Sequence, residues 1–231
     1  MPIYILVSLI ISVLILILAI WVLLRNPVNP INFWYALTMV TTGFWGVIES
    51  LLLAGRNLEW IMVWGVISYA CVPIIPFCFL HFTHHFPYKM SQFNFLARIG
   101  AVFLLLLSTV IAAIPGGVVK SAVLRPTYGD LTLNTVGWTV WAIVFFILFT
   151  WGYYNLFRKL RRSSGFSRRQ LTHVITFTII PVIIATIFDV VSPIFLGEVF
   201  AWIGVHSLLV AALGGFYYLT FFIKGVHIGS Q

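Results

Sequence analysis

Three histidines stand close together at the end of an apolar run. In the stretch HFTHHFP, His81, His84 and His85 have the H-x-x-H-H spacing that some membrane di-iron oxygenases use for metal ligands. A di-iron centre needs further histidine motifs of this kind on other helices, and the sequence holds no second such motif. We therefore interpret the three as interfacial residues at a helix end, and we expect no cofactor. A cytoplasmic metal cluster that also uses His173 and His227 stays open as an alternative.

Three other ionisable residues lie within apolar segments. Glu49, Asp189 and His206 each fall roughly 7–12 Å below one membrane surface at 1.5 Å of helix rise per residue. Ionisable side chains at such depth usually face the interior of the bundle. They predict an outward-facing polar pocket that binds a small ligand or senses protons, with Trp45 and Trp64 as candidate walls. The alternative is an interhelical hydrogen-bond clamp without a ligand.

The elements that carry these residues are membrane-spanning helices. The chain is 61% hydrophobic and 8% charged, whereas soluble domains are about half apolar and a quarter charged. We expect an all-α integral membrane protein, a single seven-transmembrane bundle over residues 1–231. The predicted helices cover about 3–24, 33–54, 60–82, 99–114, 136–157, 174–196 and 199–223. The net charge of +8 is better explained by orientation and anionic lipid than by nucleic acid.

Basic residues indicate the orientation of this bundle. With the N-terminus outside and the C-terminus in the cytoplasm, ten of the 13 lysines and arginines lie on the cytoplasmic side. Six of them belong to one segment, RKLRRSSGFSRRQL, which we expect to be a loop that contacts anionic lipid or a cytoplasmic partner. These six are Arg158, Lys159, Arg161, Arg162, Arg168 and Arg169.

Prolines interrupt two of the predicted helices. Pro73 and Pro76 lie in the middle of segment 60–82, and Pro181 lies in segment 174–196. Proline inside a spanning helix bends it and frees backbone carbonyls. These positions are candidate hinges, and static kinks for packing are the alternative. We interpret Trp141 and most other tryptophans as an interfacial aromatic belt.

Signatures of self-sufficient catalysis do not occur in the sequence. It has no G-x-S-x-G elbow, no H-E-x-x-H pair and no phosphate-binding P-loop. Retinal chemistry needs a lysine in the middle of the seventh helix, and Lys224 stands at the end of that segment. We therefore predict that the chain is not an enzyme.

Four stretches together resemble the N-terminal seven-transmembrane sensory region of bacterial histidine kinases. They are NPVNPINFWYALTMVTTGFWGVIES, YACVPIIPFCFLHFTHHFP, LFRKLRRSSGFSRRQLTHV and YYLTFFIKGVHI. The family's tryptophan and glutamate match Trp45 and Glu49, and its proline before a phenylalanine-rich run matches Pro76. A basic stretch that ends in Arg-Gln matches Arg169 and Gln170.

This resemblance implies a sensory input module of a two-component-type system, spanning the bacterial plasma membrane several times. It would detect an extracellular or membrane-borne cue and relay it through segment 199–223. The implied partners are membrane lipids, an unknown small ligand, a second copy in a homodimer, and a cytoplasmic kinase or other output domain, fused or separate. No nucleic acid is expected. The alternatives are a small polytopic transporter or channel, and a metal- or haem-dependent membrane enzyme that uses the histidines near the cytoplasmic face.

Overall fold

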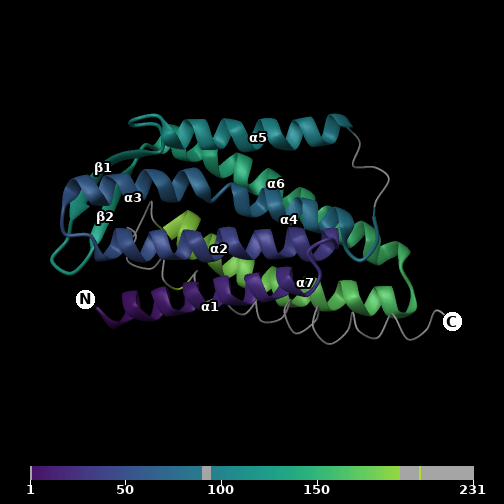
Figure 1. The fold of residues 1–231 in the computed structure, drawn as a ribbon. Coiled ribbons are helices and arrows are strands. Elements are labelled where there is room, and N and C mark those ends of the chain that lie inside the picture. Colours follow the sequence, from purple (N-terminus) through teal and green to yellow (C-terminus); the bar gives the residue numbers. More distant parts are fainter. Residues whose placement is uncertain (1, 90–94, 193–202, 204–231) are drawn as a thin grey trace.

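Long helices make up most of the fold, and a β-hairpin joins two of them (Figure 1). The computed structural model describes residues 2–89, 95–192 and 203. In chain order the elements are α1 (Ile3–Arg25), α2 (Pro30–Ala54), α3 (Leu58–Cys71), α4 (Ile74–His85), α5 (Phe95–Ala113), β1 (Val119–Leu124), β2 (Gly129–Leu133), α6 (Thr135–Arg162), α7 (Gly165–Ala185) and the π-helical turn η1 (Thr186–Val191). Within the described residues, six helical stretches are long and apolar enough to cross a membrane, and α3 and α4 together form one of them. The predicted helix 199–223 lies outside the described residues.

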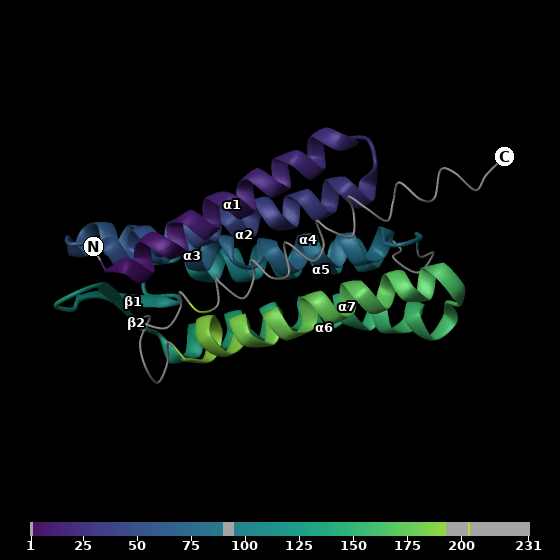
Figure 2. The same ribbon diagram turned by 90° about the horizontal axis from the view of Figure 1, so that it is seen from below.

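The helix α4 lies in the middle of the arrangement. It packs against α2 on one side and α6 on the other, while α1 covers α2, and α7 lies beside α6 (Figure 2). The helix α5 packs against α3 and α6. Gly152 of α6 lets α4 approach closely, because a Cβ atom there would come within 2.8 Å of the Phe79 ring. The buried core therefore runs between α2, α4 and α6.

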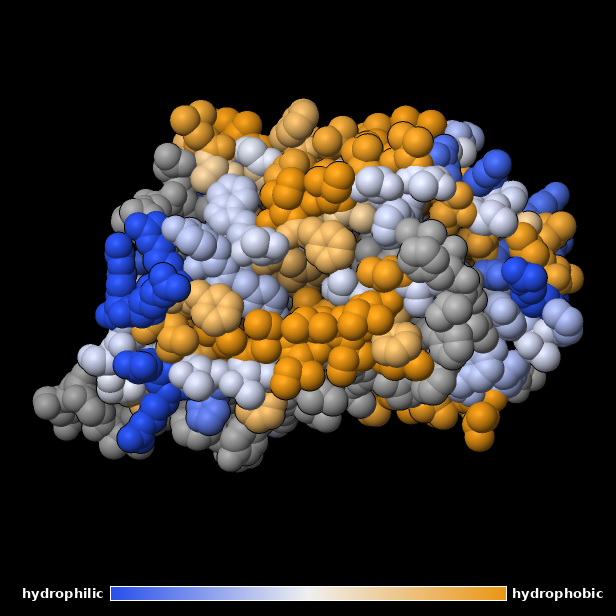
Figure 3. Space-filling model, turned by 180° about the vertical axis from the view of Figure 1, so that it is seen from behind, coloured by the Kyte–Doolittle hydropathy of each residue, from blue (hydrophilic) through white to orange (hydrophobic). Residues whose placement is uncertain are grey.

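On the face that Figure 3 shows, hydrophobic side chains cover most of the middle of the molecule, and hydrophilic ones gather toward the two ends. Large apolar residues are exposed along the outer faces of several helices, for example Ile17 on α1 and Phe103 on α5. Water-soluble proteins rarely expose apolar surface on this scale. The surface is typical of a multi-pass membrane protein.

Asparagine side chains fix where three of the helices begin. The side chain of Asn29 accepts a hydrogen bond from the Ile31 amide, and Pro30 occupies the first helical position of α2. Asn57 caps α3 and Asn134 caps α6 in the same way. Such caps satisfy amide groups that have no partner within the helix.

A β-hairpin occupies the connection between α5 and α6, where the sequence indicated only a loop. Strands β1 and β2 are antiparallel, and Leu124 pairs with Gly129 beside the turn. The Arg125 guanidinium donates a hydrogen bond to the buried Asp130 carboxylate across 3.0 Å. This bond and the charge of Asp130 raise the pKa of Arg125 above its ordinary value.

The basic segment is helical, which corrects the expected loop. The helix α6 continues to Arg162 and α7 begins at Gly165, so Ser163 and Ser164 alone connect the two. Arginine and lysine favour helix, so both helices extend past their apolar parts. Gly165 has a φ of 55°, a left-handed conformation that suits glycine at this sharp turn. We name this end of the bundle the basic end, defined by Arg158, Arg161, Arg162, Arg168 and Arg169, and the opposite end the hairpin end.

Candidate functional site

Two buried hydrogen bonds link Glu49 to its neighbours on α2 and α3. Trp45 and Glu49 are four residues apart and so share one face of α2. The Trp45 indole N–H donates to the Ser68 hydroxyl oxygen across 3.0 Å, and that hydroxyl donates to Oε2 of Glu49, also across 3.0 Å. All three residues are buried, and Glu49 is only 4% exposed. The chain Trp45–Ser68–Glu49 thus ties α2 to α3.

The second carboxyl oxygen of Glu49 has a different environment. Oε1 is buried and has no hydrogen-bond partner among the described residues. Leaving a buried polar group unsatisfied costs about 1–3 kcal/mol. A donor group that reached Oε1 would therefore bind there favourably, which makes this oxygen the point of the cluster where a ligand could form a hydrogen bond.

A break in the third membrane span lies one helical turn from Ser68. The Ser68 carbonyl accepts the last bond of α3, from the Val72 amide at 3.0 Å. Pro73 has no N–H to give to the Tyr69 carbonyl. The indole N–H of Trp141 on α6 supplies the missing bond at 2.9 Å. The Trp45–Ser68–Glu49 chain is thus attached to the last turn before the break.

Side chains from two neighbouring helices hold this break. Besides Trp141, the Thr109 hydroxyl on α5 donates to the Ala70 carbonyl across 3.3 Å. Trp141 is buried, which corrects its interpretation as a belt residue. Pro76 lies in the first turn of α4, where proline is tolerated. The hinge role of Pro73 and Pro76 stays a prediction.

The other residues predicted for the outward-facing pocket are only partly placed. Trp64 stacks on Trp60, with ring centroids 6.3 Å apart, one turn of α3 before Ser68. The backbone of Asp189 belongs to η1, eight residues after Pro181. Its side chain and all of His206 lie outside the described residues. A shared pocket of Glu49, Asp189 and His206 stays a prediction.

The three clustered histidines lie in different surroundings at the end of α4. The ring of His81 lies 4.3 Å from that of Trp34, and its Nδ1 is 3.0 Å from the Phe77 carbonyl oxygen. His84 is buried, and its ring lies edge-on to His85 at 4.9 Å. Across the described residues, no three histidine, cysteine or acidic side chains are placed to hold a metal ion.

Lys159 is buried rather than part of the basic surface, although the sequence placed it with five arginines. It is 2% exposed, and its ammonium group donates to four backbone carbonyls just after and within the last turn of α4. The acceptors are Thr83 (2.7 Å), His84 (2.9 Å), Phe86 (2.6 Å) and Tyr88 (2.6 Å). A cation at a helix C-terminus also interacts favourably with the helix dipole. Lys159 thus fastens the basic end of α4 to α6.

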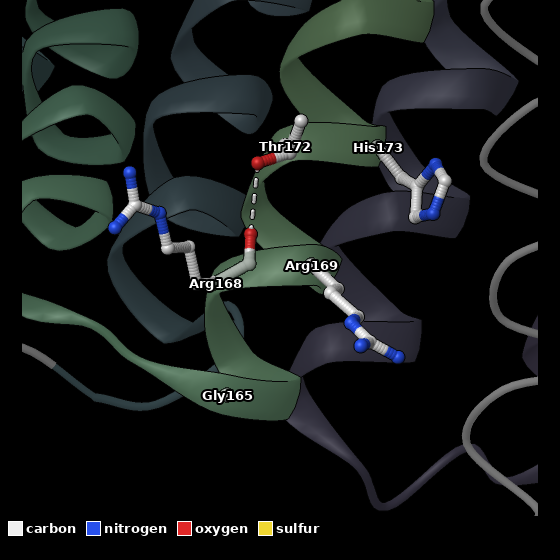
Figure 4. Close-up of a pocket in the computed structure, with 5 residues that line it drawn as sticks. All are labelled: Gly165, Arg168, Arg169, Thr172 and His173. Atoms are coloured by element: carbon white, nitrogen blue, oxygen red, sulfur yellow. Dashed lines mark hydrogen bonds between the residues drawn. The ribbon is translucent and has the colours of Figure 1, made fainter.

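A shallow pocket lies at the start of α7 on the basic end. It has a volume of about 420 Å³ and is lined by Gly165, Arg168, Arg169, Thr172 and His173. Arg169 and His173 project to one side of the helix and Arg168 to the other, while the Thr172 hydroxyl donates to the Arg168 carbonyl across 3.0 Å (Figure 4). Arg168 and Arg169 therefore remain exposed, as a contact surface for lipid or a partner requires.

Sequence reasoning missed the roles of Ser68 and Lys159. Ser68 follows Trp60 and Trp64 at steps of four residues, so helical spacing already placed it on their face. Lys159 falls on the same face of α6 as Gly152 and Asn155, both of which are buried. If the helix had been extended past the apolar segment, its periodicity would have placed Lys159 on the buried face, apart from the exposed arginines.

Comparison with known proteins identifies a family. The profile described as the N-terminal 7TM region of histidine kinase matches residues 5–224, nearly the whole chain. No curated protein matches the sequence. The match extends over every helix described above and over the predicted segment 199–223.

Proposed function

This chain belongs to the family of N-terminal seven-transmembrane regions of histidine kinases, and on that basis we propose that it senses an extracellular or membrane-borne cue for a two-component-type system. It spans the bacterial plasma membrane with the N-terminus outside and the basic end in the cytoplasm. Phosphorylation belongs to a cytoplasmic kinase or other output domain, fused or separate. A homodimer is the working unit.

The hydrogen bond between Ser68 and Glu49 carries this proposal. It joins a buried carboxyl group near the outer side to the last turn of α3 before the break at Pro73. A small ligand with a hydrogen-bond donor binds Oε1 of Glu49, because this buried oxygen otherwise lacks a partner among the described residues. Trp45, Trp64, Asp189 and His206 complete the pocket.

The signal then passes along the third span. A change at Glu49 alters the last turn of α3, and the break at Pro73 allows α3 to move relative to α4. The helix α4 is fastened to α6 by Lys159, so movement reaches the basic end through both helices. Segment 199–223 relays it to the output domain, and Pro181 with the π-helical turn η1 acts as a second hinge.

A chimera tests the proposal. Residues 1–231 are joined to a cytoplasmic histidine kinase core, and autophosphorylation is measured in membrane vesicles. Glu49→Leu and Ser68→Ala each remove the Ser68–Glu49 bond and should change autophosphorylation by about fivefold or more, since a buried bond worth about 1 kcal/mol shifts a two-state equilibrium by that factor. Asp189→Asn should also change it, because Asp189 is assigned to the same pocket.

Ser50→Ala is the matched control. Ser50 is buried next to Glu49, but its hydroxyl donates to the Gly46 carbonyl of its own helix across 2.8 Å. This variant should keep the output of the unmodified chimera. Unchanged output in both Glu49→Leu and Asp189→Asn would show that the pocket has no part in signalling.

A further inference from the structure

Within the part of the chain that the structure describes, the exposed arginines of the pocket on α7 have no acidic partner. Among the described residues, neither the Arg168 nor the Arg169 side chain makes a hydrogen bond or ion pair. The sequence has no acidic residue between Asp130 and Asp189, the stretch that forms α6 and α7. Asp189 itself is roughly 30 Å away from Arg169 along α7 at 1.5 Å per residue. An anion for this pocket must therefore come from outside α6 and α7.

An exposed apolar stripe continues from the pocket along the same face of α7. Counted from Arg169, the positions i+4, i+8 and i+11 are His173, Phe177 and Ile180, which fall within a sector of about 80° on an α-helix, and the exposed Ile187 follows in η1. The rings of His173 and Phe177 stack with centroids 6.4 Å apart. Phe177 is 40% exposed, Ile180 58% and Ile187 48%. The surface changes from cationic to aromatic to aliphatic as it enters the membrane.

This order of side chains matches the order of groups in a phospholipid. Arginine pairs strongly with phosphate oxygens through charge-assisted, often bidentate hydrogen bonds. Basic pockets at the cytoplasmic side of transmembrane helices bind anionic headgroups. A free phosphate ion would use the arginines alone and would leave the apolar stripe without a role. The combination favours a lipid over a soluble anion.

We propose that the start of α7 is a binding site for an anionic phospholipid. Arg169 holds its phosphate, while Arg168 adds positive charge from the other side of the helix. His173 and Thr172 lie one turn deeper beside the glycerol region, and an acyl chain follows Phe177, Ile180 and Ile187. The site does not depend on the sensory role, because it needs neither the Glu49 cluster nor an output domain.

Native mass spectrometry of the purified chain in detergent tests this site. Dioleoylphosphatidylglycerol is the anionic probe and dioleoylphosphatidylcholine the zwitterionic one. The double variant Arg168→Gln with Arg169→Gln should bind phosphatidylglycerol about tenfold or more weakly. The loss of one charge-assisted hydrogen bond is enough to weaken binding by this factor. Arg161→Gln with Arg162→Gln removes the same charge from exposed positions outside the pocket, and its affinity should stay within about twofold of the unmodified chain.

Two further arms separate a lipid from a free anion. Excess inorganic phosphate should not displace bound phosphatidylglycerol. Ile180→Gln should weaken lipid binding, whereas Ile143→Gln, at a similarly exposed isoleucine on α6, should not.

Three results would overturn the proposal. Equal losses in the two arginine double variants would mean a diffuse basic surface without a site. Displacement by inorganic phosphate would identify a free-anion site. Equal effects of the two isoleucine variants would show that no acyl chain binds along the apolar stripe of α7. Because all altered residues are exposed, each variant should keep the thermal unfolding temperature of the unmodified chain, so that lost binding is not lost folding.

Discussion

Replacing Lys159 by methionine should loosen the basic end of the bundle. Methionine preserves most of the unbranched stem but removes an ammonium group that donates to four carbonyls at 2.6–2.9 Å. Each hydrogen bond from a charged donor contributes about 1.5–3 kcal/mol net, and four would sum to about 6–12 kcal/mol. These values do not add for four bonds that share one donor group, so we expect a net loss of about 3–5 kcal/mol.

Thermal unfolding of the purified protein in detergent, followed by tryptophan fluorescence, measures this loss. Arg161→Met is the matched control, because it removes one positive charge from an exposed position two residues away. Lys159→Arg should also destabilise, since a planar guanidinium cannot direct its N–H groups at four converging carbonyls as a compact ammonium does. If Lys159→Met unfolds at the same temperature as Arg161→Met, the carbonyl cluster does not stabilise the fold and the reasoning is wrong.

Two further predictions concern backbone contacts and use the same unfolding assay. Trp141→Phe keeps an aromatic ring but removes the indole N–H that donates to the Tyr69 carbonyl, so stability should fall by about 1–3 kcal/mol. Gly137→Ala should destabilise because the new Cβ would collide with the Gly117 backbone carbonyl, whereas Gly100→Ala meets open space and should stabilise by about 0.5–1 kcal/mol. A destabilising Gly100→Ala, or a neutral change at either of the other positions, would contradict these contacts.

Hydropathy was sufficient to predict the six membrane-spanning stretches of the described residues but not their ends. The chain needs long apolar runs to cross a bilayer, so segments such as 33–54 are visible in the sequence alone. The basic residues after 157 were assigned to a loop because charge was taken to end a helix. Charge ends the membrane span, and the helix itself continues to Arg162 because arginine and lysine are good helix formers.

The hairpin was missed because β1 and β2 are short and stabilised by contacts that a sequence pattern does not display. The buried Asp130 pairs with Arg125 across the turn, and Arg56, far away in the sequence, donates to the Thr127 carbonyl at 3.1 Å. Local propensity carries little information about pairing of this kind.

The candidate site was predictable in its depth and not in its contacts. Glu49 and Trp45 could be placed on one face of α2 by counting, since four residues make about one turn. That Ser68 joins them, and that Trp141 completes the broken helix at Tyr69, depends on how three helices pack. Such partners come from elements far apart in the sequence, where periodicity gives no register between one helix and the next.

The central claim is that the Ser68–Glu49 bond connects the outer carboxyl group to the output. A double-mutant cycle in the kinase chimera tests it most directly, with autophosphorylation measured for Glu49→Leu, which removes the acceptor, for Ser68→Ala and for the two combined. If both residues act through one bond, the double variant should have the output of either single variant, since the second change removes an interaction already lost. Additive effects would show that Ser68 and Glu49 act separately, and no effect of either change would contradict the sensory role assigned to this site.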